Sequence, residues 1–457
     1  MKNTGIIIIC ILTLIPFWSC NGVKNCTAPQ LDMPATYSHG SVDSLSIADI
    51  EWWKFYGDTV LCHLVSQALE RNKDVLVAAK RVEEMRALYG SVKSNMLPTL
   101  SGNAYADHKT NDYGGSHATR DFEAGIKFSI SWEADLWKRL SWSRKKGESL
   151  YRASMADQRA MNMTIVAEVA ETYFRLLALD CELDIVKQTL LTRSEGLKQA
   201  KLRFEGGLTS EMVYRQAEVE YATAASLVPS LEERIKLAEN ALLLLTGEYA
   251  GAGVVRPHAI LSEVVVNEPD LGIPSFLLVR RPDLQSAEFR LRAAMADVGI
   301  AYADRFPRFT IGLTGGAEND DLSHLLKSPF SYVIGSLTSP ILDFGKRKKE
   351  YEASLARYEQ SRLLYEKSVM TAFKEVNDAV TSYRSSRLSA QLKTELLEAA
   401  RKYVDLSRLQ YEGGTSLYID VLDAQRRYFD AQIALSNSVR DEYIALVQLY
   451  KSLGGGW

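Results

Sequence analysis

The chain has 457 residues, of which 24% are charged and 46% hydrophobic, and its formal net charge is −3 at pH 7. This composition argues against a disordered chain, and the nearly balanced charge gives no indication of a nucleic-acid partner. The length would ordinarily suggest two or three domains, but an internal duplication can place the whole chain in one elongated unit.

A secretory signal peptide is predicted for residues 1–19. Its apolar run from Ile6 to Ile15 is too short to cross a bilayer as an ordinary helix. Cys20 then follows a small residue, which is similar to a bacterial lipobox, in which the cysteine is lipid-modified and begins the mature chain. We therefore expect a lipid on Cys20. The alternative is ordinary cleavage before Cys26, which would leave Cys20 a free thiol.

The lipidated N-terminal segment, residues 20–60, is expected to be extended up to about Leu45, with the folded part opening at Trp52-Trp53. Apolar residues at helical spacing predict a helix over 61–92, which begins the first repeat, and Pro98 ends it.

Two strands are expected next, at 99–107 and 122–133. The second alternates apolar and polar residues without interruption, so one of its faces is apolar and the other is polar. A loop containing Gly114-Gly115 joins the two. About ten residues per strand suit a tilted strand that spans a membrane, although a half-buried hairpin in a soluble sheet has the same pattern.

A helical hairpin is predicted over 143–246. Its first arm keeps a strict heptad of apolar residues, which is typical of a left-handed coiled coil. That heptad is made of Val169, Leu176, Leu183, Leu190, Leu197 and Phe204. An arm of this length would reach ~93 Å. Pro229 is expected to kink the returning helix.

The second half of the chain repeats the first. After an irregular crossover at 247–280, a second repeat at 281–453 is expected to hold a helix, strands at 309–315 and 329–337, and a hairpin at 346–453, with a tail at 454–457. A second heptad lies 207 positions after the first, as 376 − 169 shows for its first member, and runs through Val376, Tyr383, Ala390, Leu397, Val404 and Tyr411.

The number of strands limits how the chain could enter a membrane. Two hairpins supply four strands, whereas membrane barrels start at about eight and an open sheet edge is not tolerated in lipid. Three copies would supply twelve strands and enough long helices for a closed tube. The predicted architecture is therefore mainly α-helical with a membrane β-part: a homotrimer with a 12-stranded barrel continued by a coiled-coil α-barrel.

Five short motifs stand out along the chain: Trp52-Trp53, Arg280 to Leu284, Gly413 to Ser416, Asp420 to Gln425 and Leu453 to Trp457. Through these motifs the chain resembles the TolC-type outer-membrane factors, in particular the lipoprotein branch that serves multidrug efflux pumps of the resistance-nodulation-division class. The resemblance implies a homotrimer in the bacterial outer membrane, a large periplasmic part and an equatorial domain. It also implies two partners, a periplasmic adaptor and an inner-membrane transporter, with the chain as a passive exit duct for drugs or other small molecules.

The resemblance also implies site residues. The two Gly-Gly turns become periplasmic tips that dock the adaptor, through Gly206, Gly207, Leu208, Thr209, Gly413, Gly414, Thr415 and Ser416. The segment after the second tip would narrow the closed pore, with Asp420 and Asp423 as aperture residues and Ile419 as an apolar constriction beside them. The alternative is that both aspartates are first-turn charges that favour the dipole of the last helix.

The sequence contains no recognisable catalytic motif. We find no phosphate-binding loop, no nucleophile elbow, and no metal-like spacing among the six histidines or among Cys26, Cys62 and Cys181, so we expect no cofactor beyond the lipid. Basic runs after the strands, Arg139 to Lys146 and Lys346 to Lys349, could meet lipid phosphates or form solvated first turns. The alternative functions are the outer channel of a type I secretion system, a periplasmic adaptor lipoprotein and, third, a lipid-anchored enzyme.

Overall fold

The computed structural model describes residues 46–111, 119–251, 253–256 and 271–456, together with isolated earlier positions such as Cys26 and Tyr37. The chain divides into two compact units. The first unit consists of residues 1–30, 83–153 and 287–366, and the second of 31–82, 154–286 and 367–457. Cys20, the expected lipid site, and Trp457 lie outside the described residues.

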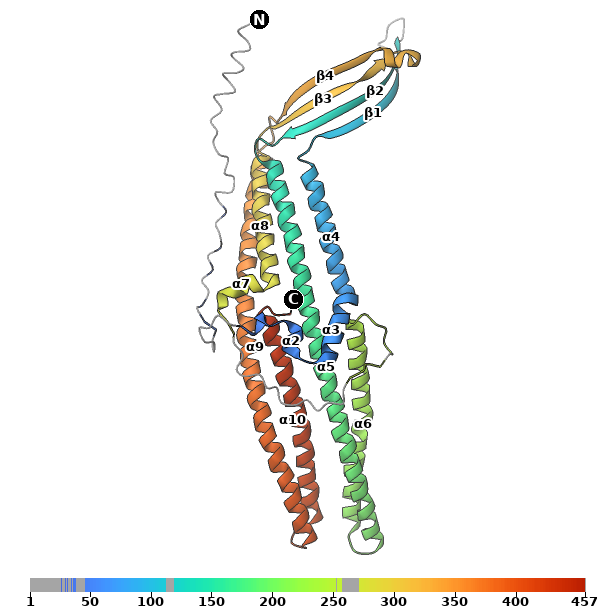
Figure 1. Ribbon diagram of the computed structural model, residues 1–457, viewed down its shortest axis with the longest axis vertical. Helices are drawn as coiled ribbons and strands as arrows, with labels where there is room; N and C mark the ends of the chain where they lie inside the picture. The colour runs from blue at the N-terminus through green and yellow to red at the C-terminus, as the bar shows by residue number, and fades with distance from the viewer. Residues whose placement is uncertain are drawn as a thin grey trace. The chain divides into compact units, whose positions relative to one another are not determined.

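The longer helices labelled in Figure 1 occur twice, and each helix of the second half follows its counterpart in the first at a nearly constant number of residues along the chain. The helices of the first half are α4 (Lys73–Ser94), α5 (Arg139–Glu205) and α6 (Glu211–Leu245), and those of the second are α8 (Pro282–Ala303), α9 (Lys346–Glu412) and α10 (Tyr418–Ser452). Both α5 and α9 have 67 residues, and both α6 and α10 have 35. The two pairs begin 207 positions apart (346 − 139 and 418 − 211), which confirms the predicted duplication.

All four predicted strands are present, in the first unit. They are β1 (Thr99–Asn111), β2 (Thr119–Ala134), β3 (Arg308–Asn319) and β4 (Pro329–Thr338). They form one antiparallel sheet in the order β1-β2-β3-β4, so β2 and β3 join the two repeats (Figure 1). The strands are longer than predicted, because pairing in the register Thr99↔Ser131 and Arg308↔Thr338 continues beyond the stretches that alternate most clearly.

The two faces of the sheet differ as the alternation predicts. On the polar face, the Tyr105 hydroxyl lies 2.8 Å from a carboxylate oxygen of Glu123 and 3.0 Å from one of Glu318. These hydrogen bonds link side chains of β1, β2 and β3. The other face exposes apolar side chains to its surroundings, including Leu100, Phe128, Ile130, Trp132 and Leu313. A sheet that leaves such a face uncovered must bury it in lipid or against another molecule.

Two aspartates set the starts of the long helices. Asp135 accepts hydrogen bonds from the backbone N–H groups of Leu140 and Ser141, at 2.8 Å each, and Asp343 accepts one from Gly345 at 3.0 Å. Arg139 donates two hydrogen bonds to Glu133, at 2.8 and 2.9 Å, and both side chains are mostly buried. This contact makes Arg139 part of the junction between strand and helix.

The predicted helix at 61–92 is wrong as a single element. The structure has α3 (Thr59–Arg71) and α4, separated at Asn72. The buried Asn72 side chain accepts hydrogen bonds from the N–H groups of Asp74 and Val75 and donates one of 2.9 Å to the Leu245 carbonyl oxygen. Asn72 therefore caps α4 and ties it to the end of α6, which apolar spacing alone cannot reveal.

Replacing Asn72 with alanine is expected to destabilise the protein by about 1–2 kcal/mol, because a helix cap and a buried hydrogen bond are lost together. The measurement is the thermal unfolding temperature of the detergent-solubilised protein. The exposed Asn95, changed to alanine, is the matched control and should leave this temperature unchanged. Equal unfolding temperatures for the two variants would contradict the role of Asn72.

Helix α6 is continuous through Pro229, so this proline does not end the helix. Within the crossover, the described residues form a 3-10 turn, η2 (Pro274–Phe276), and the short helix α7 (Leu277–Arg280), while residues 257–270 lie outside the description. The remaining short elements are η1 (Ile47–Asp49), α2 (Trp52–Tyr56) and η3 (Leu322–Lys327).

The heptad residues of α5 and α9 lie in the second unit and contribute to its packing. Val169, Leu176, Val376, Tyr383 and Ala390 are buried, and the other heptad residues nearer the tips are partly buried. A buried cluster of α3, α5 and α6 side chains surrounds Tyr173, whose hydroxyl donates a 2.8 Å hydrogen bond to Asp58. Among the described residues, no helix is apolar over enough of its length to cross a membrane.

Candidate functional site at the helical tips

The two tips are near-identical turns in the second unit. In the first, the Leu208 N–H donates to the Arg203 carbonyl oxygen at 2.8 Å and Gly207 has a φ of 68°. In the second, the Thr415 N–H donates to the Gln410 carbonyl oxygen at 2.9 Å and Gly414 has a φ of 73°. A left-handed glycine combined with this hydrogen bond is the Schellman arrangement, which ends a helix and satisfies its last carbonyl groups.

The tips differ in the side chain that follows the left-handed glycine. Leu208 exposes 75% of its surface and therefore offers an apolar contact. Its counterpart, Thr415, donates its hydroxyl to the Gln410 carbonyl oxygen at 3.0 Å. The predicted docking residues are thus presented by two turns of one backbone shape but different surface chemistry.

An aromatic pair stabilises each hairpin behind its turn. Phe204 and Tyr214 stack with ring centroids 5.9 Å apart, and Tyr411 and Tyr418 lie 5.5 Å apart. Near the turns the two hairpins touch, since the Arg203 guanidinium donates a 2.6 Å hydrogen bond to the Tyr411 hydroxyl. The tips therefore form one connected surface rather than two independent ends.

A second arginine ties three helices together further from the turns. Arg193 of α5 is buried, donates to the Glu220 carbonyl oxygen of α6 at 2.8 Å and forms a 3.0 Å ion pair with the carboxylate of the same residue. Its guanidinium also lies 5.5 Å from the ring centroid of Phe429 in α10. Arg193 therefore contacts both returning helices, α6 and α10.

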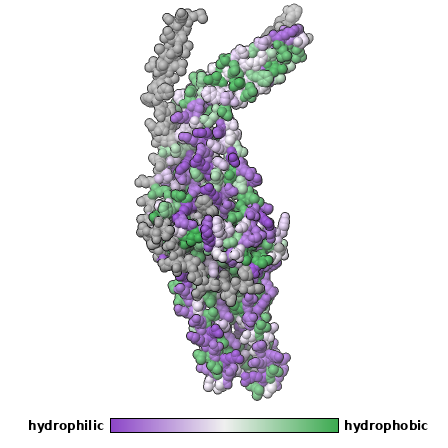
Figure 2. Space-filling model, viewed as in Figure 1, coloured by the Kyte–Doolittle hydropathy of each residue, from purple (hydrophilic) through white to green (hydrophobic). Residues whose placement is uncertain are grey.

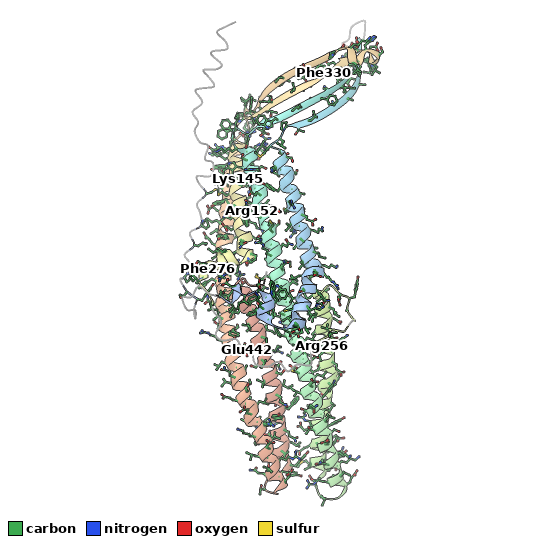
Figure 3. All side chains as sticks on the ribbon, viewed as in Figure 1. Lys145, Arg152, Arg256, Phe276, Phe330 and Glu442 are labelled. Carbon is green, nitrogen blue, oxygen red and sulfur yellow. The ribbon has the colours of Figure 1, made fainter. Side chains whose placement is uncertain are left out.

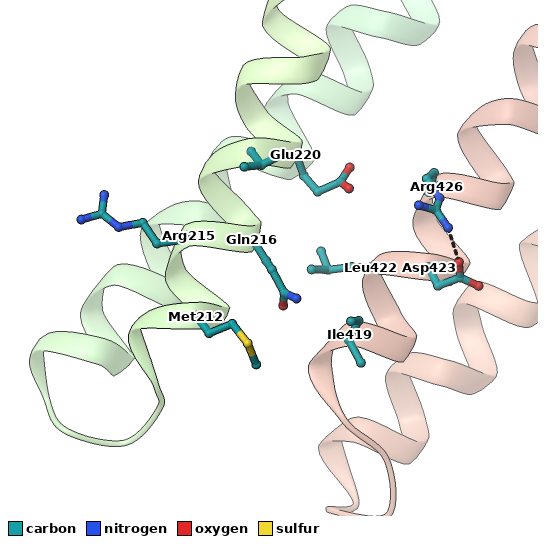
Figure 4. Close-up of a pocket in the computed structure, with 9 residues that line it drawn as sticks. Met212, Arg215, Gln216, Glu220, Ile419, Leu422, Asp423 and Arg426 are labelled. Atoms are coloured by element: carbon teal, nitrogen blue, oxygen red, sulfur yellow. Dashed lines mark hydrogen bonds and ion pairs between the residues drawn. The ribbon is translucent and has the colours of Figure 1, made fainter.

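A groove of 460 Å³ opens between the tip ends of α6 and α10 (Figure 4). Predicted aperture residues Ile419 and Asp423 line it from α10. The other lining residues were not singled out from the sequence: Met212, Arg215, Gln216, Val219, Glu220, Leu422 and Arg426. The groove combines apolar and charged side chains, which suits a helical partner that presents both kinds.

Asp423 is held by two arginines of its own helix. Arg426 donates to one carboxylate oxygen at 2.6 Å and Arg427 to the other at 2.7 Å (Figure 4 shows the Arg426 contact). The hydrogen bond from Arg427, with a smaller contribution from Arg426, lowers the pKa of Asp423. The spacings of three and four residues after Asp423 are the signal that could have predicted both contacts.

Asp420 has a helix-terminal role. Its carboxylate accepts a 3.0 Å hydrogen bond from the Leu417 backbone N–H at the start of α10, which is the alternative proposed for this residue. Ser210 at the start of α6 makes no side-chain cap, and Leu417 takes the corresponding position before α10.

Comparisons with known proteins match nearly the whole chain. Residues 64–248 and 273–455 match the family described as outer membrane efflux protein. The solvent efflux pump outer membrane protein SrpC of Pseudomonas putida is 30% identical, over 97% of each chain. The pyoverdine export outer membrane protein OpmQ of Pseudomonas aeruginosa is also 30% identical, over 100% of this chain and 97% of the relative.

The chain also superposes on solved structures of outer-membrane channels. The outer-membrane channel OprN superposes with a TM-score of 0.87 at 25% identity and covers 94% of this chain and 98% of its own. CusC, whose structures concern transmembrane channel formation, superposes with a TM-score of 0.86 at 26% identity, over 94% and 98% of the two chains.

Proposed function

Since the chain belongs to the outer membrane efflux protein family, we propose that three copies of it form the passive exit duct of a tripartite efflux pump. Family membership confirms the resemblance seen in the sequence, the predicted fold of two repeats with a membrane sheet and helical hairpins, and the general function of an outer-membrane efflux channel. This function decides against the adaptor-lipoprotein alternative.

The sheet supports assembly into a trimer. Each copy contributes four strands, and β1 and β4 are its two edges. In lipid, every unpaired backbone group is costly, so the edges must pair with those of other copies. Twelve strands from three copies would close such a barrel, with the apolar face outward and the polar face toward a water-filled lumen.

The helical tips are the proposed docking surface for the periplasmic adaptor, which would link the duct to an inner-membrane transporter of the resistance-nodulation-division class. The observation that carries this assignment is the groove between α6 and α10, where exposed Met212 lies beside charged Arg215 and Arg426. Leu208 adds an exposed apolar side chain at the first turn. Asp423 and Ile419, on the same surface, are proposed to narrow the closed pore. The curated relatives export solvents and pyoverdine, which suggests small-molecule cargo.

Lipid attachment at Cys20 would anchor the mature chain in the outer membrane. Cys20→Ala is expected to abolish incorporation of radiolabelled palmitate in growing bacteria, because no thiol remains at the expected cleavage point. Cys62→Ala is the matched control and should still be labelled. Labelling that survives in Cys20→Ala would refute lipidation at this residue.

The function is tested by planar-bilayer recordings on the purified full chain, together with its mass in detergent. We expect stepwise channel openings and the mass of a trimer. A monomer that gives no channels would overturn the proposed duct.

A further inference from the structure

Strand β4 departs from the alternation of the other strands. Phe330, Tyr332 and Ile334 lie on one face and Val333 and Leu337 on the other, so β4 is apolar on both faces. Tyr332 and Ile334 expose 47% and 51% of their surfaces, and Phe330 is partly buried. We call Phe330, Tyr332 and Ile334 the apolar strip.

The register places the apolar strip on the polar face of the sheet. Tyr332 pairs with Thr314 of β3, and directly paired residues share a face. The Thr314 hydroxyl in turn lies 2.9 Å from the hydroxyl of Ser129 on β2. Three apolar side chains therefore interrupt a face that otherwise carries polar and charged side chains and glycines.

The neighbouring strand carries glycines beside the apolar strip. Gly316 pairs with Phe330, and Gly312 pairs with Ile334. A Cβ atom at Gly316 would clash with the backbone of β2, so only glycine fits there. A Cβ atom at Gly312 would meet no atom nearer than 3.8 Å, so backbone packing does not require a glycine there. The rings of Phe330 (labelled in Figure 3) and Tyr332 are nearly parallel, with an interplanar angle of 14° and centroids 6.0 Å apart. Together they present a flat apolar surface bordered by bare backbone.

We propose that the apolar strip is a contact site for small aromatic molecules that pass through the β-lined part of the duct. This inference rests on the proposed function, in which the polar face lines a water-filled lumen. Contact between an apolar solute and the hydroxyl and charged groups of that wall contributes little binding free energy. Contact between the solute and the apolar strip is favourable, because it removes apolar surface of both from water. Because each copy has one such strip, the contact is expected to be weak. Transport requires weak contacts, since a solute that binds inside the duct must also leave it.

The test measures block of single-channel current by N-acetyl-L-tryptophanamide, a neutral aromatic probe, with N-acetylglycinamide as its non-aromatic counterpart. The wild-type channel should be blocked by the first at far lower concentration than by the second. The variant Phe330→Ser/Tyr332→Ser/Ile334→Ser should need at least about fivefold more aromatic probe for half block, as expected for a lost aromatic contact.

Single substitutions keep the test independent of how the triple variant folds. Tyr332→Thr, beside Thr314, should lose part of the block, and Tyr332→Phe should keep it because the ring remains. Ser336→Ala, on the same face of the same strand, is the matched control and should also keep it.

The possible failures are distinguishable. A conducting wild type whose aromatic block survives in Tyr332→Thr and in the triple variant overturns the contact site alone. Variants that lose the trimer mass would show that the strip is covered by a neighbouring copy, which also overturns it. A wild type without channels overturns the proposed duct and the contact site together.

Discussion

Asp423→Ala is expected to shift the ion preference of the channel severalfold toward anions. In each copy the Asp423 carboxylate balances one of two arginine charges, so its removal raises the local charge from +1 to +2. Symmetry places this change three times around the proposed aperture, where a ring of charge governs which ions pass. The measurement is the reversal potential in a potassium chloride gradient.

Asp430→Ala is the control for Asp423→Ala, because it removes the same charge two helical turns further along α10 at an exposed position. Its reversal potential should match the wild type. Arg426 and Arg427 lower the pKa of Asp423, so the carboxylate stays ionised as the pH falls from 7 to 5 and the ion preference should not change over this range. An equal shift in both variants would remove Asp423 from the aperture.

Gly414→Val is expected to abolish most efflux while the protein still reaches the outer membrane. Gly414 has a φ of 73°, a region that β-branched residues avoid, and forcing valine into it costs ~1–3 kcal/mol, enough to reshape a turn held by few contacts. The adaptor would then meet a distorted tip. The measurement is the concentration of an exported compound that inhibits growth, compared at equal amounts of outer-membrane protein.

The adjacent glycine provides the control for this experiment. Gly413 lacks a positive φ, and a Cβ there would lie 3.3 Å from the Leu409 carbonyl oxygen. Gly413→Ala should therefore retain most efflux. If Gly414→Val exports as well as Gly413→Ala, the turn geometry is not what the adaptor recognises.

The sequence predicted the elements that depend on local patterns. The alternation in 122–133 and the heptads in α5 and α9 each reflect which side chains share a face, so the strands, long helices and turns could be placed within a few residues. The duplication strengthened each assignment, because an element found in one half was expected in the other.

Contacts between distant residues could not be predicted in this way. Arg193 is a charged residue in a helical pattern, and its burial depends on Glu220 and Phe429, which belong to two other helices. The break at Asn72 similarly depends on the Leu245 carbonyl oxygen. Arg426 and Arg427 are a different case, because their spacing of three and four residues from Asp423 is a local pattern that predicts both contacts.

The pairing of β2 with β3 has a consequence for how the protein matures. It joins both repeats within one copy and leaves β1 and β4 as edges whose backbone groups have no partner in the described sheet. A lone copy would meet a high barrier to membrane entry, because these groups would have to shed water without replacement. Oligomerisation and insertion should therefore occur as one concerted step, and variants that fail to assemble should accumulate in the periplasm rather than as inserted monomers.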